Sequence, residues 1–189
     1  TVPGGPVDQL SPKYARSTTA KGDVMKVGFG DSVVAREAHL GGWEALQDVA
    51  QRIPLAAPAD SYYLSSGYGR RKDPIRKKWA NHYGLDLAGR FKTRIRATAA
   101  GIVTFAGRNG LLGRMVEISH GMGLKTRYGH LHRILVKKGQ RVEFRDKIGL
   151  MGSTGRSTGY HVHYEVIYRG KPKDPAKFLK AGKYVFKNG

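Results

Sequence analysis

Histidines are the residues of this chain whose type and spacing best suit chemistry. The chain has seven of them, and six follow residue 81. Two pairs share a His-x-His spacing, His130 with His132 and His161 with His163. Residues two apart in a β-strand project from one face, so each pair would place two imidazoles side by side. Such a pair suits a metal site, but the spacing does not say which pair binds metal, and either pair taken alone also fits ordinary packing.

A carboxylate near a further histidine extends the pattern. His82 and Asp86 lie four residues apart, and a catalytic zinc ion takes three protein ligands and a water molecule. In a straight strand the two would lie about 13 Å apart, too far to share an ion. We therefore expect a bend, and Gly84 has the backbone freedom to form one. Taken as an isolated pattern, His82 and Asp86 are better explained as two unrelated polar groups in a loop.

The elements that would position these residues are short β-strands. After Pro58, β-prone runs alternate with glycine-rich turns, which predicts a mainly β protein with an antiparallel sheet or sandwich. We expect no helix longer than two turns after residue 60. The expected strands are Tyr62 to Leu64, Ile95 to Ala97, Ile102 to Phe105, Met115 to Ile118, Lys125 to Tyr128, Ile148 to Met151 and His161 to Tyr168.

The first part of the chain has a different character. Residues 1–30 are rich in Pro, Gly, Ser and Thr, which is typical of a linker. From Trp43 to Ile53 the apolar residues have helical spacing, and Pro54 ends the run, so we expect one short helix there. This predicts two parts: residues 1–59, a linker and helix that are candidates for regulation, and residues 60–189, the β domain that contains the candidate metal ligands.

Charge and composition narrow the class of protein. The 189 residues carry a formal charge of +20 and include no cysteine, which excludes a disulfide framework. Residues 1–59 hold six basic and six acidic residues, so residues 60–189 carry the whole excess. Such density predicts attraction to nucleic acid, an anionic membrane surface or an acidic wall polymer. No apolar run reaches the roughly 20 residues that span a bilayer, and we expect any export signal to lie outside this chain.

Several motifs occur together, in order, in residues 61–179. They are Ser65-Ser66-Gly67-Tyr68-Gly69-Arg70-Arg71, His82 with Asp86, Thr126-Arg127-Tyr128-Gly129-His130-Leu131, Gly139-Gln140-Arg141-Val142, Ile148-Gly149-Leu150-Met151-Gly152-Ser153-Thr154-Gly155, and Ser157-Thr158-Gly159-Tyr160-His161-Val162-His163-Tyr164-Glu165-Val166. Through these motifs the segment resembles the lysostaphin-type (LytM-like) zinc metallopeptidases. The resemblance implies the LytM-like fold, a duplicated hybrid motif of mainly antiparallel strands.

The resemblance also implies a role for each site residue. His82, Asp86 and His163 would bind one Zn²⁺, and His130 and His161 would be the catalytic histidines. Zinc lowers the pKa of bound water and polarises the scissile carbonyl, while the two histidines position the water, carry its proton and stabilise the oxyanion. The resemblance gives no role to the remaining histidines. We expect Glu165 to support the site rather than to act as a general base.

The function implied is a zinc endopeptidase that hydrolyses peptide cross-links of bacterial peptidoglycan, with D,D-endopeptidase activity, in the periplasmic or extracellular part of the cell envelope. Its expected partners are peptidoglycan and, through charge, anionic envelope polymers. One alternative is a non-catalytic module that binds the wall and recruits or activates another hydrolase. A nucleic-acid binder is suggested by charge alone, since the sequence has no recognition helix or aromatic RNA-binding motif. The bond cleaved and the oligomeric state stay open.

Overall fold

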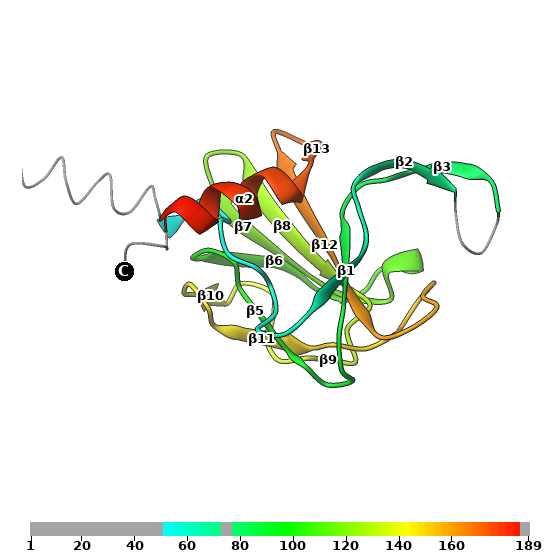
Figure 1. The fold of residues 1–189 in the computed structure, drawn as a ribbon. Coiled ribbons are helices and arrows are strands. Elements are labelled where there is room, and N and C mark those ends of the chain that lie inside the picture. Colours follow the sequence, from blue (N-terminus) through cyan, green and yellow to red (C-terminus); the bar gives the residue numbers. More distant parts are fainter. Residues whose placement is uncertain (1–50, 73–76, 186–189) are drawn as a thin grey trace, which may run out of the picture. The chain divides into compact units, whose positions relative to one another are not determined.

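The computed structural model describes residues 51–72 and 77–185. These residues form a mainly β domain, as the sequence predicted (Figure 1). They also include one C-terminal helix. The linker expected in residues 1–30 lies outside the described residues, and so does most of the helix expected from Trp43 to Ile53. Each of the seven expected strands overlaps a strand of the structure. No helix in the described ranges is long and apolar enough to cross a bilayer.

The main sheet is antiparallel, and β12 lies near its middle. β12 pairs with β4 through residues 161–164 and with β8 through residues 163–168, while β13 pairs with its C-terminal end. Seven strands follow one another in the order β1 (Tyr63–Ser66), β4 (Leu85–Ala88), β12 (His161–Tyr168), β8 (Leu124–Gly129), β7 (Arg114–Gly121), β6 (Gly101–Arg108) and β10 (Arg141–Val142), and β13 is Lys171–Lys173.

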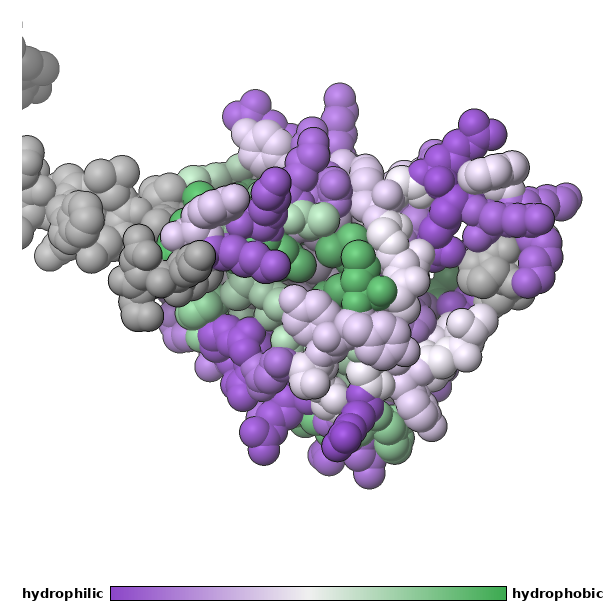
Figure 2. Space-filling view, in the orientation of Figure 1, coloured by the Kyte–Doolittle hydropathy of each residue, from purple (hydrophilic) through white to green (hydrophobic). Residues whose placement is uncertain are grey.

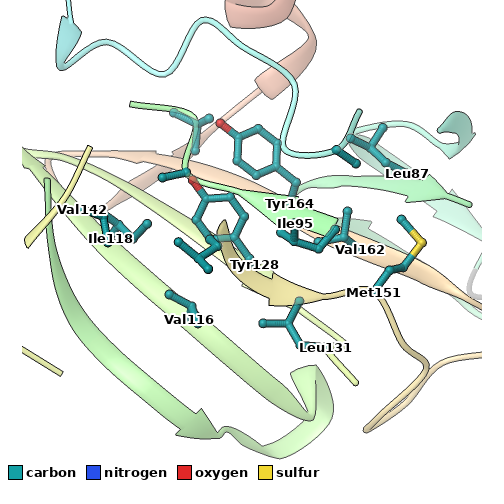
Figure 3. Packing of buried hydrophobic residues seen from close by; sticks show 14 of the residues in the cluster. Leu87, Ile95, Val116, Ile118, Tyr128, Leu131, Val142, Met151, Val162 and Tyr164 are labelled. Carbon is teal, nitrogen blue, oxygen red and sulfur yellow. The ribbon is translucent and has the colours of Figure 1, made fainter. Parts of the chain in front are cut away.

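A smaller sheet forms the second layer. It consists of β5 (Arg94–Arg96), β11 (Lys147–Leu150) and β9 (Arg133–Ile134). Ile95 and Ile148 from this sheet are fully buried in one cluster with Val116 and Val162 of the main sheet (Figure 3). Burial of this apolar surface between two sheets is the principal stabilising term of such a sandwich, and it holds β12 and β4 in fixed register.

The hairpin of β2 (Gly69–Lys72) and β3 (Trp79–His82) is separate from both sheets. The two strands pair only with each other, with Gly69 opposite His82 and Arg71 opposite Ala80. Alternation along the strands puts Arg71 and His82 on one face of the hairpin and Arg70 and Trp79 on the other. In Figure 1 the hairpin extends beyond the edge of the main sheet.

The expectation that no helix longer than two turns follows residue 60 is wrong. α2 spans Pro175–Val185, and its Phe178 and Leu179 pack against the core cluster. Asp174 caps its first turn, because the Asp174 carboxylate accepts a hydrogen bond from the Ala176 N–H (3.0 Å). A capping Asp followed by Pro is a helix-start signal that could have revealed the helix.

Residues 51–59 pack against the β domain. Ala59 is 2% exposed and belongs to the core cluster. The Pro58 carbonyl accepts a hydrogen bond from the Arg96 N–H (2.8 Å), and the Leu55 backbone lies against Gly182 of α2. The last residues before position 60 therefore contribute to the folded unit.

Candidate metal centre

Three side chains meet at the junction of β3, β4 and β12. His82 Nε2, Asp86 Oδ1 and His163 Nδ1 lie at the corners of a triangle with edges of 3.0, 3.1 and 2.8 Å. Ligand atoms on a tetrahedral zinc ion, with bonds of about 2.0–2.1 Å, are separated by about 3.3 Å. The two imidazoles and the carboxylate therefore fit a zinc ion that has one open position, and these are the residues that the resemblance implied.

The strand register explains how distant residues meet. His163 of β12 lies directly opposite Asp86 of β4, so their side chains share one face of the sheet. His82 is the last residue of β3, and only two residues separate it from the start of β4 at Leu85. The expected bend is present, but Gly84 does not take a positive φ. It is required for close approach, since a Cβ on Gly84 would lie 2.5 Å from the Tyr164 carbonyl oxygen.

The far side of each ligand is held by a hydrogen bond. The His82 Nδ1–H donates to the Gly67 carbonyl oxygen (2.6 Å), and the His163 Nε2–H donates to Glu165 Oε1 (3.0 Å). Asp86 Oδ2 accepts from the Arg71 guanidinium (3.1 Å). These bonds leave the second nitrogen of each imidazole and Oδ1 of Asp86 for the metal. The sequence did not name these partners, except that Glu165 was expected to support the site.

His130 and His161 lie beside the triad. Their ring centroids are 4.6 Å apart, and His161 Nε2 is 3.7 Å from Asp86 Oδ1. The Nδ1–H of His130 donates to the Thr154 carbonyl (2.7 Å), and the Nδ1–H of His161 donates to the Gly159 carbonyl (3.0 Å). Each ring thus keeps Nε2 as a proton acceptor. His130 has a φ of 59°, a backbone conformation that is uncommon outside glycine and is often found at functional sites.

The surroundings shift the pKa values of these groups in the metal-free chain. Burial lowers the pKa of His163, but hydrogen bonds to Asp86 and Glu165 outweigh it and raise the pKa to about 9. Burial lowers the pKa of His130 to about 4 against the hydrogen bond to Thr154. Burial raises the pKa of Asp86, yet its bonds to His163 and His82 hold it well below the usual range. His130 is therefore neutral at neutral pH and can accept a proton.

The five residues line one cavity of about 140 Å³. The other histidines do not line it: His132 contacts the Phe91 ring edge-on at 4.7 Å, and His120 is buried among other residues. His39 lies outside the described residues. The complete lining is Arg71, His82, Asp86, Leu111, Leu112, His130, Arg156, Ser157, Thr158, His161 and His163.

The model of peptidase family M23 matches residues 80–175, which include all five site residues. The chain therefore belongs to peptidase family M23, a family of zinc metallopeptidases. The resemblance found in the sequence is confirmed.

Two named relatives are peptidoglycan enzymes. The chain is 41% identical over 135 residues to the peptidoglycan DD-endopeptidase ShyA of Vibrio cholerae, a match that covers 71% of this chain and 31% of the relative. It is 44% identical over 112 residues to the DD-carboxypeptidase/endopeptidase Mpg of Neisseria meningitidis, covering 59% of this chain and 26% of the relative. The chain thus spans about a third or less of the length of these relatives.

Solved structures agree with the sequence matches. A zinc-containing peptidase from Vibrio cholerae has a TM-score of 0.59 and 38% identity, covering 65% of this chain and 38% of that chain. The catalytic domain of lysostaphin from Staphylococcus simulans has a TM-score of 0.58 and 30% identity, and the match covers 63% of this chain and 92% of that chain. This confirms the LytM-like fold.

Proposed function

We propose that this protein is a zinc-dependent endopeptidase that hydrolyses D,D peptide cross-links of bacterial peptidoglycan. The observation that carries the proposal is the meeting, in one cavity, of a three-ligand metal site with two further histidines. The names of ShyA and Mpg, which describe DD-endopeptidase activity, support the choice of substrate.

In this proposal, three residues bind the metal and two transfer protons during amide hydrolysis. When bound, zinc supplies a Lewis acid that activates water and polarises a carbonyl. His82, Asp86 and His163 hold the ion, and their own hydrogen bonds fix their orientation. The Nε2 atoms of His130 and His161 take the proton from the attacking water, deliver it to the leaving amine and, when protonated, stabilise the oxyanion. We assign these tasks to the pair.

The direct test is digestion of purified muropeptides, analysed by mass. We expect the zinc-loaded chain to split cross-linked dimers, and chelation or His163→Ala to abolish the reaction. His132→Ala is the matched control, because His132 also belongs to a His-x-His pair but lies outside the cavity. Turnover that survives both chelation and His163→Ala would refute the proposal.

The second candidate is a wall-binding module that recruits or activates another hydrolase. It is favoured by the 39% identity to a lipoprotein NlpD/LppB homolog of Pseudomonas aeruginosa, whose name specifies no hydrolase. The two candidates separate in one experiment, since a module would bind wall material but release no muropeptide in the presence of zinc.

The place of action follows from the substrate. We propose that the protein works in the cell envelope, in the periplasm or outside the cell, where peptidoglycan lies. Its excess of basic residues would also attach it to anionic envelope polymers. We further propose that residues 1–50 regulate access to the metal centre.

A further inference from the structure

We propose that Arg71 and Arg156 form a carboxylate-binding subsite beside the metal centre. This subsite takes the free α-carboxylate of the residue on the amine side of the scissile bond. The inference rests on the proposed function and deepens it, because it names the substrate group that the cavity selects.

The charge of the cavity is the first argument. Among the described residues that line it, Asp86 is the single acidic side chain, and Arg71 and Arg156 carry permanent positive charge. A bound divalent ion and the Asp86 carboxylate together carry one net positive charge, which adds to the charges of the two arginines. In a cavity of about 140 Å³, these charges act at short range. The lining thus favours a substrate with an anionic group close to the scissile amide.

The Arg71 side chain is held by Asp86 and keeps further N–H donors available. Its Nη2 donates to Asp86 Oδ2 at 3.1 Å, and the register of the hairpin places it on the same face as His82. A guanidinium has five N–H donors in a rigid fork, and this contact uses one nitrogen. No other described residue accepts a hydrogen bond from Arg71. The free edge of the fork can therefore bind a carboxylate next to the metal.

Arg156 reaches the cavity from a different element, the turn between β11 and β12. Its backbone N–H donates to the Leu111 carbonyl (2.8 Å). The neighbouring Gly155 has a φ of +77° and packs so closely that a Cβ would lie 2.4 Å from the Gly113 nitrogen. The Thr154 hydroxyl donates to the Leu131 carbonyl (2.9 Å). The turn is thus fixed on the β7 and β8 side of the site, and the backbone of Arg156 is fixed with it.

The chemistry of the proposed reaction accounts for such a subsite. A carboxypeptidase by definition releases a residue that carries a free α-carboxylate. A D,D cross-link joins two D α-centres, so the residue on its amine side can carry a free α-carboxylate as well. One cationic subsite on the amine side would therefore serve both reactions in the name of Mpg.

The test compares two peptides that differ in one group. A stem pentapeptide ending in D-Ala-D-Ala is offered with a free terminal carboxylate or with a terminal carboxamide, and kcat/KM is measured for the zinc-loaded full chain. We expect the carboxylate peptide to be preferred on the order of tenfold, the size of a charge-assisted hydrogen bond. Arg156→Gln and Arg71→Lys should bring the ratio towards one, mainly through KM.

The controls keep the outcome specific. Arg141→Gln removes the same charge at the opposite edge of the main sheet, on β10, and should leave the ratio unchanged. Zinc content is measured for each variant, because Arg71 touches a metal ligand. A ratio near one in the native chain, or a ratio unaffected in both arginine variants, overturns the subsite.

A measurement of peptide binding tests the subsite independently of the proposed enzymatic activity. The endopeptidase proposal fails if cross-linked dimers are not split. Where neither pentapeptide is cleaved, calorimetric titration of the zinc-loaded chain with both peptides still decides the subsite. Tighter binding of the carboxylate peptide, lost in Arg156→Gln, supports it. Equal binding of the two peptides, or no binding of either, overturns it.

Discussion

At the scale of single residues, the metal centre depends on one position that has no side chain. A Cβ on Gly84 would lie 2.9 Å from His163 Cε1 and 2.5 Å from the backbone oxygen of Tyr164. Neither neighbour can yield, because Tyr164 is fully buried and His163 is bonded on both sides. The sequence identified Gly84 as permissive for a bend, whereas the packing shows that it is needed for space.

Gly84→Ala should therefore displace His163 and weaken zinc binding by roughly ten- to a hundredfold, the usual effect of losing ligand orientation. A competition titration with a chromophoric chelator measures the affinity. Gly107→Ala serves as the control, since the added Cβ would meet only the Phe105 ring at 3.4 Å, on a strand outside the site. Native zinc affinity in Gly84→Ala would show that the site tolerates the displacement.

Single residues also show why both members of one His-x-His pair line the cavity, whereas only His130 of the other pair does. β8 ends at Gly129, so His130 and His132 do not share a strand face, and His130 has a positive φ. His161 and His163 both lie in β12 and both reach the site. The identical spacing could not separate these cases, because a strand end depends on long-range pairing. Only the family resemblance selected His163 as the ligand.

At the scale of elements, most strands that bury apolar residues were predictable, whereas β4, which buries Leu85 and Leu87, and the polar strands β2 and β3 were not. β12 and β7 are β-branched and buried, which the pattern reveals directly. β2 and β3 are short and largely exposed, and they exist because they pair with each other. The meeting of Asp86 with His163, 77 residues apart, follows from the pairing of β4 with β12, which no local pattern encodes.

A buried histidine joins several of these elements and makes their stability depend on pH. The His120 Nδ1–H donates to the Ala100 carbonyl (2.7 Å), and its Nε2 lies 2.7 Å from the Thr126 hydroxyl, which contacts the Tyr128 hydroxyl at 2.9 Å. Burial lowers the pKa of His120, against the bond to Ala100. The folded state thus favours neutral His120, and the unfolded state takes up the proton first as pH falls.

The contribution of His120 to stability should be complete above about pH 6.5, the unfolded pKa, and should be lost as pH falls towards the lower folded pKa. Urea unfolding between pH 5 and 7.5 measures the effect. His120→Asn should be less stable at pH 7.5 by about 1–3 kcal/mol, because a buried bond is disturbed. Its free energy of unfolding should also fall less steeply with acid than that of the native chain. Parallel pH profiles for the two proteins would contradict this assignment.

At the scale of the whole molecule, residues 51–59 belong energetically to the β domain. Besides Ala59, the Ala57 carbonyl accepts a bond from the Arg145 guanidinium (2.8 Å), and the Gln51 carbonyl accepts one from the Ala100 N–H (3.2 Å). A chain that starts at Asp60 should lose about 2–4 kcal/mol of unfolding free energy through these contacts. Comparing muropeptide cleavage by a chain that starts at Gln51 and by the full chain tests regulation by residues 1–50, and equal rates would count against it.

The distribution of charge gives the last prediction. The whole excess of +20 lies in residues 60–189, and hydrophilic residues gather over the β2–β3 hairpin (Figure 2). In the sequence, β2 contains Arg70 and Lys72, and Lys77 and Lys78 directly precede β3. Attachment to an anionic polymer by many such charges is screened over a Debye length of about 8 Å at physiological salt, whereas amide hydrolysis at the metal depends on short-range contacts. Raising NaCl from 50 to 500 mM should therefore reduce binding to purified wall sacculi at least tenfold, while kcat/KM for a small uncharged peptide changes less than threefold. A pelleting assay and a soluble peptide assay measure the two quantities on the same zinc-loaded protein. If both fell in parallel, the basic surface would act in catalysis rather than in attachment to the envelope.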